Sequence, residues 1–312
     1  MAVEADLARS LLRLEAARQE SLSRMRIWIG AVMASAGAVA LYFYLASSPA
    51  GTLVTLAIGL IVASGVSIHL LRKVKRAFKE EIMPALLEEI DPSLQYEAGG
   101  CVSQEDFRHC GLFMRPDRYR GKDLIEGRIG QTAVRFSLIH AEEEYEETST
   151  DADGNRRSET QYRTIFRGLF FVADFNKHFS GRTLVRPKAV TFISRLFGSH
   201  VALEDPQFNE LFTVNSTDQI EARYIMTASL MEKFKVLRSK AGAFRASFFL
   251  GQLILALEMP WNAFEPSMRR SLADSDQVRK IQGNLRLITG IVEDLGLNVR
   301  IWTKAGTDPA RQ

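Results

Sequence analysis

Two long apolar runs without a charged residue, residues 27–46 and 53–71, constrain the fold of this chain more than any other feature. A helix of about 20 residues, with a rise of ~1.5 Å per residue, matches the hydrocarbon core of a bilayer, which is about 30 Å thick. In lipid the backbone must satisfy its own hydrogen bonds, so each run has to be helical there. Only residues 47–52 separate the runs. We therefore predict a transmembrane helical hairpin.

Basic residues lie at the open end of this predicted hairpin and not at its connection. The connection carries no charge, whereas lysines and arginines flank the two runs. The positive-inside rule places both flanks, and with them both termini, in the cytoplasm. Basic side chains at the ends of spans also attract anionic lipid, and we expect such contacts at the cytoplasmic face of the bilayer. The residues concerned are Arg24, Arg26, Arg72, Lys73, Lys75 and Arg76.

Small residues recur at intervals of four on both runs, which places them on one face of each helix. Such faces let two helix backbones approach closely. In an antiparallel hairpin the first set would meet the second in reverse order, so we predict that the two sets form the contact between the helices. The alternative is that one set faces a second copy of the chain. The sets are Gly30, Ala34 and Ala38 on the first run and Gly59, Ala63 and Ser67 on the second.

The charge of the chain is unevenly distributed. The 312 residues carry a formal net charge of +3, but residues 1–76 alone hold nine lysines and arginines against four acidic residues, which is +5. The remaining residues therefore carry −2, so the basic excess belongs to the flanks of the hairpin. Such a distribution favours an anionic membrane surface as the partner and argues against nucleic acid.

Two cysteines, Cys101 and Cys110, would lie in a reducing cytoplasm, where we expect no structural disulfide. His109 is adjacent to Cys110, but zinc sites usually bring thiols in close pairs and need a fourth ligand. We expect buried or half-buried thiols and no metal site.

No motif for phosphate binding or nucleophilic catalysis is present. Gly121, Gly127 and Gly130 lack the spacing of either glycine-rich phosphate loop, so we expect them to form turns. The serines lie outside any nucleophile motif, and the histidines at 140, 178 and 200 have no identifiable partner in the sequence. We therefore predict no cofactor and no catalytic residue.

Apolar periodicity predicts the secondary structure. Residues 4–26 have the pattern of an amphipathic helix, which lies on the membrane surface, packs on the soluble domain or runs straight into the first span. Residues 72–90 continue as a helix that Pro84 kinks or restarts. Strands are predicted at residues 124–129, 133–145, 162–174, 183–186, 213–214, 244–250, 253–259 and 299–302, and a helix at 278–295.

The acidic run at residues 142–147, with the polar stretch to residue 160, is predicted to form a long mobile hairpin tip. It does not suggest a cation site, because alternate residues of a strand point to opposite faces.

These elements predict an α+β fold, in which a transmembrane α-helical hairpin precedes a cytoplasmic domain with a mainly antiparallel sheet and a packed C-terminal helix. We divide the chain into an amphipathic N-terminal helix (1–26), a transmembrane hairpin (27–71), a helical juxtamembrane connector (72–118), the α+β domain (119–304) and a flexible tail (305–312).

One polar cluster is a candidate ligand site. Asp174, Asn176, Lys177 and His178 follow the apolar strand at residues 168–173, where polar side chains gather at a strand end. The alternative is a turn whose side chains are satisfied locally. Glu221 and Arg223 form a second candidate, and they could instead pair with each other or with a core helix.

Several segments are similar to a bacterial family of unknown function, the one numbered three-one-three-seven. The resemblance spans most of residues 120–302, and it implies a cytoplasmic domain held by two spans in the bacterial inner membrane. It implies no activity and no catalytic residue. The matching segments are residues 126–130, 134–137, 140–142, 166–176, 181–183, 204–208, 221–224, 230–231, 264–267 and 300–302, with Phe179.

We expect this chain to be a membrane-tethered cytoplasmic interaction or regulatory module with an unidentified protein partner. A membrane-bound enzyme, such as a hydrolase acting on lipid or envelope material, is the alternative, and a homo-oligomer is a further arrangement. An enzyme should show a deep pocket where titratable groups converge. A binding module should instead offer an apolar patch or an open sheet edge.

Overall fold

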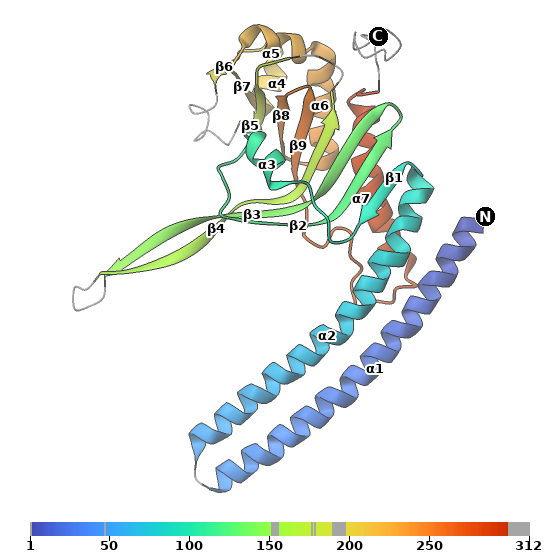
Figure 1. Cartoon of the computed structure of the whole chain (residues 1–312), viewed down its shortest axis with the longest axis vertical. Helices are drawn as coiled ribbons and strands as arrows, with labels where there is room; N and C mark the ends of the chain where they lie inside the picture. Colours follow the sequence, from blue (N-terminus) through green and yellow to red (C-terminus); the bar gives the residue numbers. More distant parts are fainter. Residues whose placement is uncertain are drawn as a thin grey trace, which may run out of the picture. The chain divides into compact units, whose positions relative to one another are not determined.

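The computed structural model describes residues 2–46, 48–150, 156–175, 177, 179–188 and 198–298. Over these residues the fold is α+β, with two long apolar N-terminal helices, a nine-stranded antiparallel sheet and a C-terminal helix (Figure 1). The predicted fold class is therefore confirmed. The chain divides into two compact units, Met1–Glu89 with Phe264–Gly283, and Ile90–Ala263 with Asn284–Gln312. The five segment boundaries given above stay a prediction.

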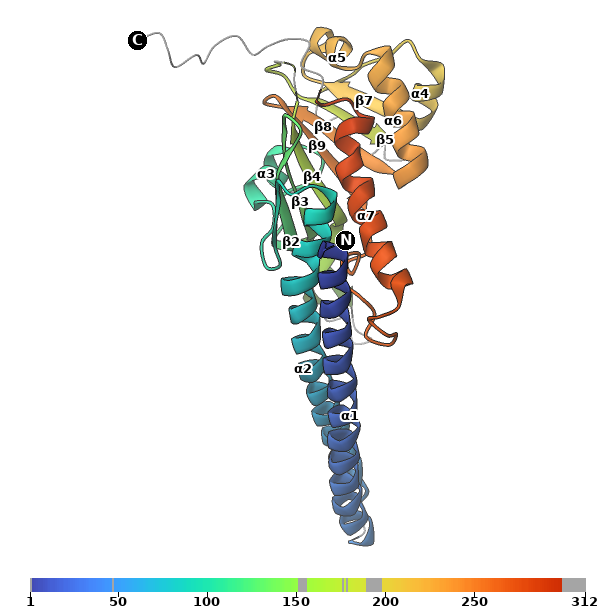
Figure 2. The same cartoon turned by 90° about the vertical axis from the view of Figure 1, so that its right-hand side faces the viewer.

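Two helices, α1 (Ala2–Leu45) and α2 (Pro49–Ile90), run side by side through most of the first unit (Figures 1 and 2). The amphipathic stretch at residues 4–26 continues into the first apolar run without a break, as one of the three alternatives predicted. α2 also continues through Pro84 to Ile90. Proline removes one helical hydrogen bond, and the carbonyl that loses it belongs to Glu80, which is exposed.

On α2 the small residues face α1. Gly59 and Ala63 are buried and Ser67 is half-buried. A Cβ atom at Gly59 would lie 2.7 Å from the Cβ of Ala36, so only glycine permits this approach.

On α1 the packed face differs from the predicted one. Gly30, Ala34 and Ala38 are exposed, whereas Ala36 and Ala40 are buried. A shift of two positions turns a helix by about 200°, which exchanges one face for the other. Phe43 explains the choice, because it lies on the face of Ala36 and its ring would be 2.7 Å from a Cβ atom at Gly51.

A buried ion pair holds the segment before helix α7 (Ser275–Asp294) against α1 within the first unit. The Arg18 guanidinium donates to the Glu15 carboxylate at 2.7 and 2.9 Å and to the carbonyl of Met268 at 3.0 Å. Glu15 also accepts from the backbone N–H of Leu272 at 2.7 Å. The pair is therefore fully hydrogen-bonded, as a buried charge requires.

The second unit is built on the sheet, whose strand order is β1-β2-β3-β4-β9-β8-β5-β7-β6. All the pairings are antiparallel. The strands are β1 (Leu94–Glu97), β2 (Arg118–Ile129), β3 (Thr132–Thr150), β4 (Arg156–Asp174), β5 (Thr183–Pro187), β6 (Ser199–His200), β7 (Phe212–Ser216), β8 (Phe244–Phe249) and β9 (Gln252–Glu258).

Helices cover both faces of this sheet. α3 (Gln104–His109) lies on one face and α6 (Ala228–Ala241) on the other (Figure 2). Two short helices, α4 (Pro206–Leu211) and α5 (Gln219–Ile225), complete the unit. Under α3 the core is aromatic, with the ring of Phe107 5.0 Å from that of Phe113 and 5.3 Å from that of Phe170.

The predicted strands within the described residues are confirmed, but several are longer than the pattern indicated, and β1 and β6 were not predicted. The acidic residues 142–147 lie on β3 in the outer part of the predicted hairpin, paired with residues 159–164 of β4, and the mobility of this part stays a prediction. Their charges are offset across the hairpin, since Glu143 forms an ion pair with Arg163 and Glu144 accepts a hydrogen bond from the Tyr162 hydroxyl at 2.9 Å. Residues 151–155 and the predicted strand at 299–302 lie outside the described residues.

The glycines of β2 have a different role from the predicted one. Gly130 occupies a turn with φ 59°, as expected. Gly121 and Gly127 lie inside the strand, where a Cβ atom would come within 2.2 Å of the Cβ of Cys101 and of the Ser93 carbonyl, respectively. Close approach of a neighbouring segment therefore requires these two glycines.

Candidate functional site

The first predicted cluster is only partly within the described residues. Asp174 ends β4 opposite Gln252, while Asn176 and His178 lie outside the described residues. The Lys177 ammonium donates to the carbonyl of Tyr224 at 2.6 Å and lies 4.4 Å from the centre of that ring. Burial lowers the pKa of Lys177. This lysine therefore joins the loop after β4 to α5.

The second predicted pair is divided between two local contacts. Glu221 accepts from the backbone N–H groups of Ser180 at 3.0 Å and Gly181 at 2.7 Å. Arg223 donates to the carbonyl of Gln219 on its own helix at 3.3 Å. Glu221 thus positions a loop, and ligand binding by these residues stays a prediction.

The structure has two smaller clefts, and each is lined by a member of the predicted site. Asp174 lines a cleft of about 490 Å³ with Glu126 and Arg135. Arg223 lines another of about 390 Å³, together with Asp205. Of the described residues, Asp174 and Arg223 thus line different clefts.

The basic residues predicted to contact lipid have varied surroundings. Arg24 pairs with Glu20 and Arg76 with Glu80, each one helical turn along the same helix. Lys75 pairs with Glu265 at 3.0 Å. The other three, Arg26, Arg72 and Lys73, are exposed. Contact of these six side chains with lipid stays a prediction.

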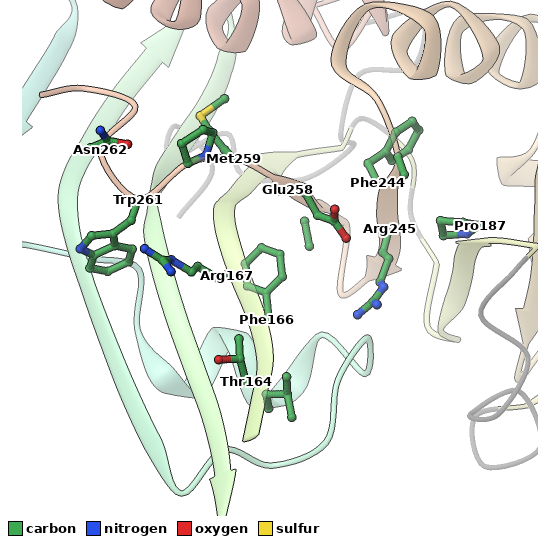
Figure 3. Close-up of a pocket in the computed structure, with 14 residues that line it drawn as sticks. Thr164, Phe166, Arg167, Pro187, Phe244, Arg245, Glu258, Met259, Trp261 and Asn262 are labelled. Carbon is green, nitrogen blue, oxygen red and sulfur yellow. The ribbon is translucent and has the colours of Figure 1, made fainter. Parts of the chain in front are cut away.

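A larger cleft, of about 880 Å³, lies where β4 extends beyond its neighbour β9 (Figure 3). β9 ends at Glu258, which pairs with Gly168, so the preceding part of β4 has passed the end of β9. Residues 164–167 of β4 form one wall, and the start of β8 with residues 258–262 forms another. No pattern in the sequence indicated this cleft.

Polar and aromatic side chains line the cleft together. Arg245 at the start of β8 is half-buried, with its guanidinium carbon 4.7 Å from the centre of the Phe113 ring. Burial lowers the pKa of Arg245, and the nearby Glu258 carboxylate opposes that shift. Arg167 extends toward Trp261 in Figure 3. The site therefore presents cations beside an aromatic ring.

Where β4 borders the cleft, its pairing with β3 on the other side is irregular. Ala141 pairs with Phe166 and Glu142 with Thr164, which leaves Ile165 as the extra residue of a β-bulge. A bulge turns side chains and backbone groups away from the regular ladder. The bulge thus sits in the stretch of β4 that lines the cleft.

The two thiols differ in their surroundings. Cys110 is fully buried, and burial raises the pKa of its thiol to about 12. Cys101 is half-buried, and burial and then the Glu97 carboxylate raise its pKa. Within the described ranges no three histidine, cysteine or acidic side chains come together as metal ligands.

These surroundings predict different reactivities, because the thiolate is the nucleophile. With the folded chain in detergent at pH 8, the Cys110→Ser variant should take up one maleimide at Cys101. Its rate should rise with pH, since the raised pKa leaves most of the thiol protonated. The Cys101→Ser variant should take up none until it is unfolded. Mass spectrometry of the intact chain measures both, and rapid labelling of Cys110 would contradict its burial.

Comparison with known families gives a match to one segment of the chain. Residues 164–297 match the family model described as "Protein of unknown function (DUF3137)". The resemblance predicted from the sequence is therefore confirmed over this segment. The DUF3137 segment includes both walls of the large cleft, from Thr164 to Asn262.

Among solved structures, the chain is similar to the crystal structure of the mycobacterial trehalose monomycolate transport factor A, TtfA. The match has 12% sequence identity and a TM-score of 0.35, and it covers 65% of this chain and 88% of that chain. No curated protein sequence matches this chain.

Proposed function

We propose that this protein is a membrane-tethered interaction module that holds a partner protein at the cytoplasmic face of a bacterial inner membrane. The observation that carries the proposal is the open edge of β4. In the part of the chain that the structure describes, no strand pairs with the β9 side of β4 before Gly168. An open edge presents a row of backbone donors and acceptors to a partner.

The two N-terminal helices support the tether. Both are long and apolar enough to cross a bilayer, and only 11% of the most apolar window of each is buried within the protein. A core helix of a soluble protein would be mostly buried. Large apolar side chains such as Leu41, Leu53 and Ile61 are exposed instead, as lipid contact requires.

Orientation of the tether follows from charge. With Arg26, Arg72 and Lys73 exposed at the open end of the hairpin, both termini lie in the cytoplasm. A reporter enzyme that is active only outside the cytoplasm, fused to either terminus, should be inactive, while the same reporter inserted after Ala50 should be active. Activity at a terminus would overturn the proposed topology.

A hydrolase gains no specific support from the geometry. Among the described residues, Asp174, Lys177, Glu221 and Arg223 are held in separate local contacts rather than in one pocket. The interaction module is therefore the function that the site supports best.

Photo-cross-linking in intact membranes tests the module. A photoreactive amino acid in place of Thr164, which is exposed on the free edge, should form an adduct with a partner protein. The same amino acid in place of Ser239, which is exposed on α6, serves as the control and should give none. Absence of an adduct at Thr164, or equal adducts at both positions, would overturn the proposal.

A further inference from the structure

The large cleft combines a free strand edge with an electrostatic preference. Residues 158–167 of β4 pair with β3 on one side only, within the ranges that the structure describes. After Glu258 the chain leaves the sheet through Pro260, which has no N–H to donate. The open side of β4 therefore accommodates a further extended strand.

The cations of the cleft come from two strands. Arg167 is exposed on β4, and Arg245 is half-buried on β8. Arg186 on β5 is buried, and the register that pairs Val185 with Ala246 places it beside Arg245. Burial, and next the charge of Arg245, lower the pKa of Arg186. The lining of the cleft thus holds two guanidinium groups, of Arg167 and Arg245, against the one carboxylate of Glu258, and Arg186 adds a positive charge beside Arg245; this balance favours an anionic occupant.

The charge on this edge also disfavours pairing with a neutral or basic strand. Exposed edges are commonly protected by charged residues and bulges, which disfavour pairing with a neutral strand. β4 has both, in the exposed Arg167 and in the bulge at Ile165. A strand of opposite charge removes the repulsion and pairs selectively.

We infer that the cleft binds an extended acidic segment of a partner protein, which adds as a strand to the free edge of β4 and places carboxylates at Arg167 and Arg245. The inference rests on the proposed function and names the chemistry of its partner. A free anion would use the guanidinium groups but not the backbone edge. Trp261 and Phe166 give the apolar part of such a strand a surface to pack on.

Peptide binding to the full chain in detergent tests this inference. The probe is a fluorescent peptide of repeated Thr-Thr-Glu-Glu, about ten residues long, which at ~3.3 Å per residue spans residues 158–167 and presents carboxylates on both faces of the strand, as Arg167 and Arg245 require. Fluorescence anisotropy should show saturable binding that weakens as salt is raised. A peptide with lysine in place of glutamate should not bind. Equal binding of the two peptides would overturn the inference.

A second probe separates strand addition from charge alone. The same acidic peptide with an N-methyl group on every amide keeps its charge but has no N–H group to donate to a neighbouring strand. We expect it to bind at least tenfold more weakly. If both acidic peptides bind equally, the cleft is an anion site and the strand-addition inference is wrong.

Variants of the cleft identify the site. Arg167→Gln and Arg245→Gln should each weaken the acidic peptide about tenfold, the loss typical of one charge-assisted hydrogen bond. Arg167 is exposed, so its variant tests the inference even if Arg245→Gln fails to fold. Arg128→Gln, an exposed arginine paired with Ala133 at the opposite end of the sheet, is the matched control and should bind normally. Unchanged binding in both cleft variants would overturn the inference.

A lipid headgroup or a second copy of the chain in the cleft would give results that differ from those of an acidic segment. Displacement of the peptide by short-chain phosphatidylglycerol at equal concentration would assign the cleft to a lipid headgroup. An adduct at Thr164 of twice the chain mass would assign it to a second copy. Each result overturns the acidic-segment inference. An adduct with another protein that persists unchanged in Arg167→Gln would overturn it while leaving the proposed function intact.

Discussion

Replacing Gly168 by alanine should lower the free energy of unfolding of the sheet by about 3 kcal/mol, the upper range for an inserted methyl group without space. A Cβ atom there would lie 2.1 Å from the carbonyl oxygen of Leu257 on β9, and backbone cannot move aside as a flexible side chain can. β4 and β9 must therefore separate at the end of β9, beside the cleft. Urea denaturation followed by near-ultraviolet circular dichroism measures the loss.

The same substitution at Gly283 is the matched control. Gly283 lies inside α7 and is exposed, and a methyl group added to it would meet no atom within 4 Å. Alanine there should raise stability by about 0.5–1 kcal/mol, because glycine loses more backbone entropy in a helix. A loss below about 1 kcal/mol for Gly168→Ala would show that the strands have more freedom than the structure indicates.

Replacing Glu15 by alanine should detach residues 264–274 from α1. The substitution leaves the Arg18 guanidinium buried without its carboxylate and the N–H of Leu272 without its acceptor. Removing one partner of a buried ion pair costs about 3 kcal/mol or more. Residues 264–274 should therefore be detached from α1 about a hundredfold more often. Trypsin cleavage after Arg269 and Arg270, which are exposed in this segment, measures that frequency.

Glu20→Ala provides the matched control on the same helix. Glu20 pairs with Arg24, but both side chains are more than 60% exposed, so solvent screens the pair. Such pairs contribute less than about 1 kcal/mol, and the cleavage rate should stay unchanged. Equal cleavage of the two variants would mean that burial of the Glu15 pair does not hold the segment.

The spacing of apolar and polar residues within short stretches of the sequence predicted much of this fold. The apolar runs, the hairpin at residues 244–259 and the helix ending near Leu295 depend on residue spacing within short windows, and each was found where expected. The first-helix contact face was predicted wrongly. Two sets of small residues are compatible with helical spacing, and the choice between them depends on Phe43 meeting Gly51 of the other helix.

The candidate site was much less predictable. Asp174 and Lys177 were selected because polar side chains follow an apolar strand, but the structure places one beside a small cleft and bonds the other to Tyr224. The large cleft could not be predicted from the sequence, because its lining residues come from segments far apart in the chain. Arg167 and Arg245 are 78 positions apart in the sequence.

By itself the sequence determined two bilayer-length helices, the antiparallel strands and the uneven charge, because composition and spacing set these properties within a few helical turns or strand residues. Only the tertiary structure decided that β9 stops at Glu258 while β4 continues, and that Arg245 lies across the resulting gap from residues 164–167. Strand pairing joins segments far apart in the chain, so the open edge and its cations exist only after the sheet has formed.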